Sequence, residues 1–338
     1  MYMEHFGLND YPFRITPDID YLYMSSVHSR AKAYMDYAIF NREGFVVITG
    51  DIGSGKTTLI KKLLIELDEN IKVAKIFQTQ LDEVELLQAI LVEFGLNPFS
   101  AKKVELLNML NQFLVESYLE GKQVLLVIDD AQNLSKRVLE EVTMLSSVET
   151  QKEKILHVIL VGQPELNQKL EAPDMEQLLQ RVSLRYHVRA LTSDETKEYI
   201  LHRLKVAGIT KKIFMDDTYE GIYEYSGGVP RLINTICDTA LTCAFADDYN
   251  IVDKDEFEVS IKELQWRKYE ERYDDIYENS NDAKNDYLYK EDVNTSGDDK
   301  TESARDQVHG AYDNIASRAL VEMCVQLKRI ADSMEKNK

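Results

Sequence analysis

Short aliphatic and β-branched runs alternate with longer amphipathic stretches between residues 43 and 188. Such runs, bounded by polar turns, predict strands at residues 45–49, 73–77, 124–128, 158–161 and 186–189. The stretches between them have the apolar spacing of helices, at residues 56–67, 83–94, 102–119, 136–145 and 164–169. Strands that alternate with helices are typical of a parallel sheet covered by helices, so the pattern predicts an α/β domain.

Only helical patterns follow from residue 192 onward. Thr192, with Glu195 three positions later, forms the signature of a capping box at a helix start. Further helices are predicted at residues 216–225, 230–245 and 254–266, and Pro230 suits the first position of the second of these. The sequence therefore predicts an α/β domain over residues 1–190 and a small helical lid domain over residues 191–266.

The last part of the chain changes composition twice. Residues 267–310 are rich in acidic and polar residues and nearly lack aliphatic ones, which predicts a disordered linker. Residues 311–338 regain a helical stripe, with apolar side chains three or four apart at Leu320, Met323, Leu327, Ile330 and Met334. This stripe fits a helix docked on its own protein and a coiled-coil or partner-binding helix equally well.

Composition narrows the class of protein. Of the 338 residues, 44% are hydrophobic, which suffices for a substantial core. No run approaches the roughly 18 to 20 apolar residues of a membrane-spanning helix, and no export signal is recognisable, so we expect a cytoplasmic protein without a transmembrane segment. Three cysteines without metal-ligand spacing agree with a reducing compartment. The net charge of -19 argues against broad binding to nucleic acids, although it does not exclude a local basic patch.

A phosphate-binding motif lies between the first predicted strand and the helix that follows it. Residues 50–57 read Gly-Asp-Ile-Gly-Ser-Gly-Lys-Thr and satisfy the pattern G-x-x-x-x-G-K-[ST]. In such a loop the backbone N–H groups surround the phosphates, the lysine reaches the β- and γ-phosphates, and the hydroxyl ligates Mg²⁺. We therefore expect ATP and Mg²⁺ as ligands, with the nucleotide contacts at Gly50, Asp51, Ile52, Gly53, Ser54, Gly55, Lys56, Thr57 and Thr58, and with Thr57 on the metal.

Two acidic residues follow the strand predicted at residues 124–128. An acidic side chain at the end of a neighbouring buried strand is needed in such a site to hold Mg²⁺. Asp129 is the candidate for this metal-side carboxylate, and Asp130 is placed to orient or polarise the attacking water. Because Asp130 is one methylene shorter than Glu, we expect slow hydrolysis.

Polar residues at three other places are further candidates for contact with the triphosphate. Gln163 ends a predicted strand, where it can sense the γ-phosphate or hold the attacking water, or only cap its own turn. Arg231 starts a helix and can swing over the phosphates when the lid closes, or remain an ordinary surface residue. Arg181 and Arg185 precede the last strand, where an arginine of an oligomeric ATPase can reach the neighbouring subunit's site. We favour Arg185 for this role, and pairing with local carboxylates is the alternative.

Several motifs together resemble one family, that of the ExeA-like (general secretion pathway protein A) AAA+ ATPases. This family includes the ATPases of exosortase and exopolysaccharide loci and relatives in pilus biogenesis. The resemblance covers about residues 1–265, and its motifs lie at residues 6–8, 12–13, 16–18, 21–23, 28, 44–50, 128–134, 162–166, 180–181 and 227–231. The N-terminal motifs and Gly-Gln-Pro-Glu-Leu at 162–166 are more specific than the phosphate-binding loop.

The resemblance assigns a role to each candidate. It implies that Asp129 is the Walker B aspartate, and that Gln163, Arg185 and Arg231 lie in the sensor-1, arginine-finger and sensor-2 regions. It also implies a homo-oligomer, as a ring or a filament, and we expect the adenine contacts near residues 13–18. The chain departs from the family in having Asp130 where Glu is usual and Ile19 where Pro is usual. We also expect it to lack the membrane-spanning and peptidoglycan-binding parts of the full secretion proteins.

Three functions fit these observations. The leading hypothesis is a motor or switch ATPase in a cell-envelope process such as secretion, exopolysaccharide export or pilus assembly. Its protein partner would bind the C-terminal helix or the lid, and could hold it at the inner membrane. A DNA-binding regulator, similar to transposition ATPases of the MuB and TnsC kind, is disfavoured by the acidic charge and by the lack of a basic stripe. A nucleotide-binding scaffold with little turnover is suggested by Asp130.

Overall fold

A five-stranded parallel sheet is the centre of the α/β part of the chain. The computed structural model describes residues 2–40, 44–99, 102–148 and 154–272. Its strands are β1 (Phe45–Gly50), β2 (Ile71–Ile76), β3 (Gln123–Ile128), β4 (Leu156–Gly162) and β5 (Leu184–Val188), in the order β2-β3-β4-β1-β5. Every residue of β1 and β4 is buried, which explains why these strands appear in the sequence as continuous apolar runs. The predicted α/β class with a parallel sheet is confirmed.

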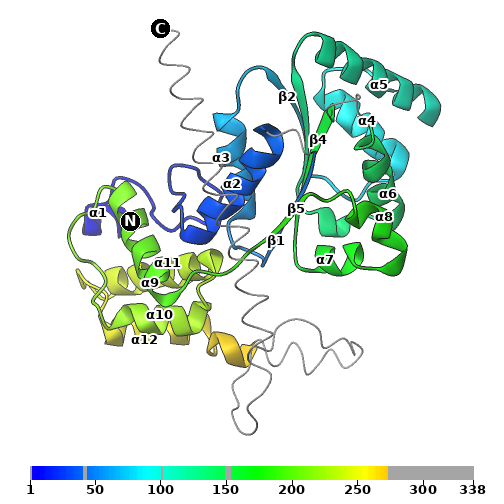
Figure 1. Ribbon diagram of the computed structural model, residues 1–338. Coiled ribbons are helices and arrows are strands. Elements are labelled where there is room, and N and C mark those ends of the chain that lie inside the picture. The colour runs from blue at the N-terminus through cyan, green and yellow to red at the C-terminus, as the bar shows by residue number, and fades with distance from the viewer. Residues whose placement is uncertain (1, 41–43, 100–101, 149–153, 273–338) are drawn as a thin grey trace, which may run out of the picture. The chain divides into compact units, whose positions relative to one another are not determined.

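Helices cover both faces of this sheet (Figure 1). One face packs against α2 (Ser26–Phe40) and α3 (Lys56–Glu66), through side chains of β1 such as Val46 and Ile48. The other face carries α4 (Glu83–Glu93), α5 (Lys103–Leu119), η1 (Ala131–Asn133), α6 (Lys136–Leu145), α7 (Glu165–Leu170), η2 (Pro173–Met175) and α8 (Glu176–Leu179). Alternate residues of β1, β3 and β4 thus belong to two separate hydrophobic clusters.

The strand order brings the functional motifs to one edge of the sheet. β4 lies between β1 and β3, with Thr49 beside Gly162 and Leu160 beside Ile128. The residues that follow β1, β3 and β4 therefore meet at the carboxyl ends of the strands. Ligands of open α/β sheets bind in a crevice outside this edge.

The helical domain contains α9 (Ser193–Val206), α10 (Thr218–Ser226), α11 (Pro230–Ala246) and α12 (Lys254–Leu264). The predicted capping box is present: Glu195 N–H donates to Thr192 Oγ1 at 3.2 Å, and Thr192 N–H donates to Glu195 Oε2 at 3.1 Å. Pro230 occupies the first turn of α11, as predicted. Local sequence signals therefore locate the starts of α9 and α11 correctly.

The N-terminal segment packs differently from its predicted assignment to the α/β domain. It begins with α1 (Tyr2–Phe6), and its buried residues Tyr2, Phe6, Phe13 and Tyr21 belong to the hydrophobic cluster of the helical domain. Tyr2 also donates a hydrogen bond to Asp238 on α11. Since aromatic side chains bury large apolar areas, this segment is part of the core of the helical domain.

The other differences are helices that were not predicted and small shifts in the limits of elements. The sequence did not predict α1, α2, α8, η1 or η2, and the helices and strands that it did predict begin or end within about two residues of their predicted limits. Residues 269–272 are helical, although the predicted linker starts at residue 267, and Arg272 there donates to the carbonyl of Tyr225. The predicted linker from residue 273 and the predicted helix at 311–338 lie outside the described residues.

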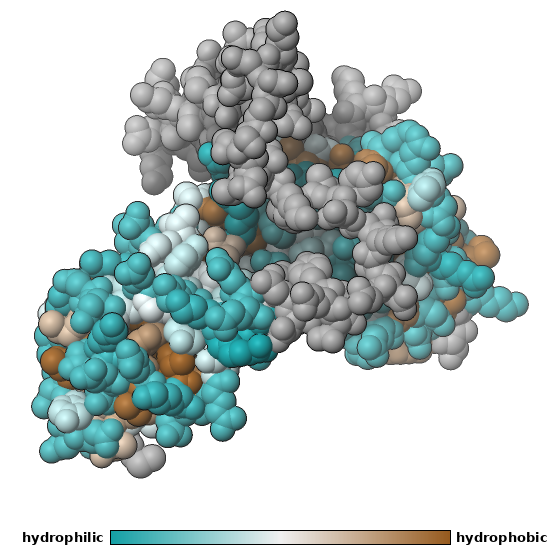
Figure 2. Space-filling view, turned by 90° about the horizontal axis from the view of Figure 1, so that it is seen from below, coloured by the Kyte–Doolittle hydropathy of each residue, from teal (hydrophilic) through white to brown (hydrophobic). Residues whose placement is uncertain are grey.

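Hydrophobic side chains form only small, separated patches on the visible surface seen from below (Figure 2). Among the described residues, no helix combines the length and the apolar character that crossing a membrane requires.

Candidate nucleotide-binding site

The loop between β1 and α3 is stabilised by the side chain that its motif supplies. Lys56 Nζ donates to the carbonyls of Gly50 and Asp51, at 2.7 and 2.8 Å. Lys56 is 8% exposed, and burial lowers the pKa of its ammonium group. The charge therefore lies inside the loop, with only backbone carbonyls as hydrogen-bond acceptors, and an anionic ligand would satisfy it better.

Two further carbonyls of the loop are bonded from outside it. Gly53 accepts a hydrogen bond from the backbone N–H of Arg231 at 3.2 Å, and Ser54 accepts one from His28 Nε2 at 2.8 Å. Gly53 has φ +83°, and a Cβ there would lie 2.5 Å from Cβ of Arg231. Glycine is therefore required at position 53 by both backbone conformation and the close approach of α11.

The start of α3 presents free backbone donors. Gly55, at φ 94°, is the N-cap residue, and no side chain caps the helix. The first intrahelical bond runs from Leu59 N–H to Gly55 O, so the N–H groups of residues 55–58 have no acceptor within the helix. Free N–H groups and the positive end of the helix dipole make this position a binding site for an anion such as phosphate.

Thr57 and Asp129 come together beside this helix start. Thr57 Oγ1 donates to Asp129 Oδ2 at 2.7 Å, and Asp130 N–H donates to Asp129 Oδ1 at 2.9 Å. Asp129 is 3% exposed, and its burial raises the pKa of the carboxyl group, although both hydrogen bonds act against this rise. A hydroxyl and a carboxylate in contact are the oxygen donors that Mg²⁺ prefers.

Gln132 connects Asp130 with the end of β4, and the sequence did not single it out. Its Nε2 donates to Asp130 Oδ1 at 3.1 Å, and its Oε1 accepts from Gln163 N–H at 3.0 Å. A Cβ at Gly162 would lie 2.9 Å from Gln132 Oε1, so glycine there makes room for the amide. Asp130 itself has a left-handed backbone, with φ 51°. In the sequence, the signal for Gln132 was a polar residue two positions after Asp130. In the fold, Gln132 is 8% exposed.

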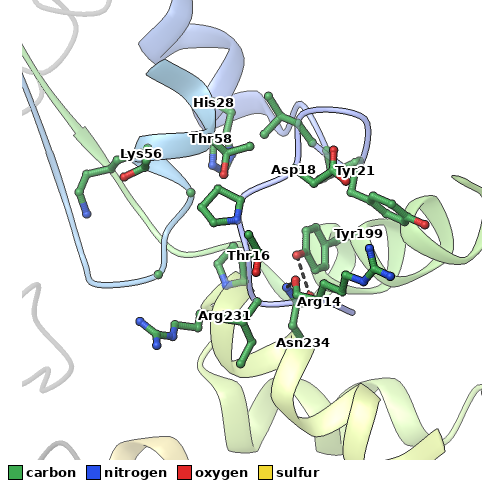
Figure 3. Close-up of a pocket in the computed structure, with 18 of the residues that line it drawn as sticks. Arg14, Thr16, Asp18, Tyr21, His28, Lys56, Thr58, Tyr199, Arg231 and Asn234 are labelled. Atoms are coloured by element: carbon green, nitrogen blue, oxygen red, sulfur yellow. Dashed lines mark hydrogen bonds between the residues drawn. The ribbon is translucent and has the colours of Figure 1, made fainter. Parts of the chain in front are cut away.

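A cleft of about 600 Å³ lies between the phosphate-binding loop and the helical domain, and Lys56, Thr57 and Asp130 are among the residues that line it. Residues 14–18 of the N-terminal segment line it between the start of α3 and α11, as Arg14 and Thr16 show in Figure 3. The carbonyl of Arg14 accepts from Arg203 Nη2 and from Asn234 Nδ2, each at 3.3 Å. Tyr199 Oη donates to Asn234 Oδ1 at 2.8 Å, so buried side chains of α9 and α11 hold this segment.

Comparison with known proteins identifies the fold and the family. A family model described as an AAA domain matches residues 40–170, which include the loop, Asp129 and Gln163. The chain is 41% identical over 247 residues to general secretion pathway protein A of Aeromonas hydrophila, a match that covers 73% of this chain. The chain belongs to the AAA+ ATPase family of general secretion pathway protein A. It spans 45% of that relative's length.

Solved structures share the AAA+ fold at low sequence identity. Cdc6p of Pyrobaculum aerophilum matches with a TM-score of 0.58 and 17% identity, over 77% of this chain and 70% of that chain. ORC2 of Aeropyrum pernix matches with a TM-score of 0.53 and 16% identity, over 70% and 66%. The AAA+ ATPase fold implies nucleotide binding.

Most of the residues predicted for the site of this AAA+ chain lie together. The cleft is lined by Ile52, Gly53, Gly55, Lys56, Thr57, Thr58, Asp130, Gln163 and Arg231, and Asp129 contacts Thr57. Arg185 does not line the cleft: it is exposed and forms an ion pair with Glu171 at 2.7 Å. Arg181 is half-buried outside the cleft lining. This ion pair is the pairing with a local carboxylate that the sequence analysis gave as the alternative for Arg185. The role of Arg185 in a neighbouring subunit stays a prediction.

Proposed function

We propose that this chain binds ATP with Mg²⁺ in the cleft and hydrolyses it to ADP and phosphate. The observation that carries the proposal is the convergence of free N–H groups at the start of α3, the ammonium of Lys56 and the Thr57–Asp129 pair on one cleft. Each of these groups suits a different part of a metal-bound triphosphate. The loop sequence is the typical motif for this ligand.

Three parts of the site would hold the ligand. Phosphate oxygens would accept hydrogen bonds from the N–H groups of residues 55–58 and from Lys56 Nζ. Thr57 and Asp129 would hold Mg²⁺, which when bound neutralises charge on the phosphate oxygens. We assign the base to the part of the cleft lined by residues 14–18, which lies away from Lys56 (Figure 3).

The reacting end of the cleft contains Asp130 and Gln163. Asp130 can accept a hydrogen bond from the attacking water and so orient it, because its carboxylate lines the cleft and is restrained by Gln132. Gln163 can hold the same water or the γ-phosphate. Arg231 extends from the start of α11, where lid movement would carry it toward or away from the phosphates (Figure 3).

For the biological role we propose a motor or switch in a cell-envelope process, as the name of the secretion relative suggests. The helical domain and the residues beyond it are the expected binding surfaces for a partner protein. We also propose that the chain acts as a homo-oligomer in which Arg185 reaches the neighbouring subunit, since AAA+ sites gain transition-state charge stabilisation from such an arginine. A cytoplasmic location at the inner membrane would follow from that partner.

The site is tested by ATP binding and turnover of the purified chain. Wild type should bind ATP in the presence of Mg²⁺ and release phosphate, and Lys56→Ala should lose both because the main phosphate contact is removed. Arg137→Ala serves as the control, since this residue lies on α6 outside the cleft. Equal ATP affinity in wild type and Lys56→Ala would contradict the assignment.

A further inference from the structure

His28 contacts the phosphate-binding loop from α2, a helix that the sequence did not predict. Its Nε2 donates to the carbonyl of Ser54 at 2.8 Å, and its Nδ1 accepts from Ser25 Oγ at 2.7 Å. The side chain is 3% exposed, and burial lowers the pKa of its ring, which favours the neutral form that this pattern requires. Both ring nitrogens are therefore engaged, and the ring has one orientation.

The bond to Ser54 fixes the direction of the next backbone donor. A trans peptide is planar, so the C=O of Ser54 and the N–H of Gly55 point in opposite directions. The hydrogen bond to His28 holds this carbonyl in place, and the Gly55 N–H is thereby held in the opposite direction. The fit is close, because a Cβ at Gly55 would lie 3.0 Å from His28 Nε2.

The same end of α2 is tied to the helical domain. Ser26 N–H and Ser26 Oγ both donate to Glu195 Oε1, at 3.2 and 2.8 Å. Glu195 is the capping-box residue of α9, and its other oxygen accepts from Thr192 N–H. A chain of short contacts therefore runs from the start of α9 through the start of α2 to the phosphate-binding loop.

We propose that His28 is a positioning residue that orients the Gly55 N–H for the nucleotide phosphates and couples the loop to helix α9. The inference rests on the proposed function, because the ligand in question is the nucleoside triphosphate of that site. His28 lines the cleft, but the role proposed here is indirect. It acts through Ser54 on one side and through its neighbours Ser25 and Ser26 on the other.

The first test is the ATP affinity of two substitutions, measured by calorimetry with Mg²⁺ present. His28→Ala should weaken ATP binding about tenfold, the effect of one hydrogen bond of roughly 1.4 kcal/mol. His28→Gln should recover most of this loss, because its amide nitrogen can replace Nε2 as the donor to Ser54. His202→Gln is the matched control: this partly buried histidine lies on α9 outside the cleft lining and should leave affinity unchanged.

The second test is hydrogen exchange of backbone amides at saturating ATP. ATP should slow exchange in the first turn of α9 in wild type, and this protection should be reduced in His28→Ala although the site is full. Unchanged affinity in His28→Ala, or a glutamine variant as weak as the alanine variant, would overturn the inference. Failure of the wild-type chain to bind ATP would contradict the proposed function. Normal ATP binding by wild type with no effect of His28→Ala would contradict only the role of His28.

Discussion

At the scale of single residues, Gln132 is the clearest addition to the motifs that the sequence showed. Its side chain bridges Asp130 and Gln163, and its backbone carbonyl accepts a hydrogen bond from Lys169 on α7. A residue that contacts both candidates for water positioning should affect the chemical step more than nucleotide binding. None of these hydrogen bonds of Gln132 involves the phosphate-binding loop.

We predict that Gln132→Glu lowers kcat by about tenfold or more and leaves ATP affinity unchanged, because a carboxylate would repel Asp130 and could not donate to it. Steady-state turnover and equilibrium binding together measure this split. Asn133→Ala is the matched control, since the side chain of Asn133 bonds Thr79, and its backbone N–H, which donates to the carbonyl of Asp130, is kept in the alanine variant. A parallel loss of affinity would show that Gln132 supports the fold of the site instead of orienting Asp130.

The buried ring of His28 predicts how stability changes with pH. Burial is the main cause that lowers its pKa from 6.5, and the bond to Ser54 and the charge of Glu195 oppose this. As pH falls through 6.5, the unfolded chain takes up a proton that the folded chain does not, so the free energy of unfolding falls. Above this pH the contribution is constant.

Wild type should therefore lose more stability than His28→Gln between about pH 7 and about pH 5, and the two should change in parallel above about pH 7. Urea unfolding at several pH values measures the difference. A steeper loss in the glutamine variant would mean that the folded state stabilises the protonated ring.

At the scale of elements, α9 depends on its first turn for both stability and domain contact. Thr192→Ala removes the side-chain acceptor for Glu195 N–H and should lower the free energy of unfolding by about 1 kcal/mol. Thr210→Ala, at an exposed position outside any helix, is the control. Denaturant unfolding checks the difference, and equal losses in both variants would show that the cap contributes nothing measurable.

Elements with strong local signals could be predicted from the sequence. The buried strands appeared as apolar runs, and the capping box located α9, because both signals are contained within a few residues. The packing of Tyr2, Phe6 and Phe13 into the core of the helical domain could not be predicted, since it joins segments more than 200 residues apart in the chain. Because the sequence does not show this packing, the N-terminal segment was assigned to the α/β domain, whose first predicted strand follows it.

In the candidate site too, residues with a local sequence signal could be predicted, and residues placed by distant packing could not. The loop at residues 50–58 could be predicted because the ligand fixes the spacing within its motif, and Asp129 because it directly follows an apolar strand. His28 and Gln132 appeared only as positions in motifs of the family resemblance, at residue 28 and within residues 128–134, and no role was assigned to either. Their contacts depend on how α2 and η1 approach the sheet edge, and the sequence contains no local signal for that approach.

At the scale of the whole molecule, the exposed ion pair of Arg185 with Glu171 is compatible with exchange to a neighbouring subunit. If Arg185 acts between subunits, Arg185→Ala should lower turnover at least tenfold. Mixing Arg185→Ala with Lys56→Ala should then restore part of the activity, because one variant supplies an intact nucleotide site and the other supplies the arginine.

The rate of the mixture should exceed the sum of the two separate rates, as measured by phosphate release. Arg181→Ala mixed with Lys56→Ala is the matched control and should show no such gain. A mixture that is only additive would place Arg185 outside the reaction, with the local pair to Glu171 as its role.

ATP turnover and particle size of the purified chain, measured with and without duplex DNA, test both the nucleotide site and the envelope role. We expect phosphate release and ATP-dependent assembly in wild type, neither in Lys56→Ala, and no change on adding DNA. Turnover that survives the loss of Lys56 would contradict the assignment of the site. Stimulation of turnover or of filament formation by DNA would contradict the envelope role and favour a DNA-binding regulator.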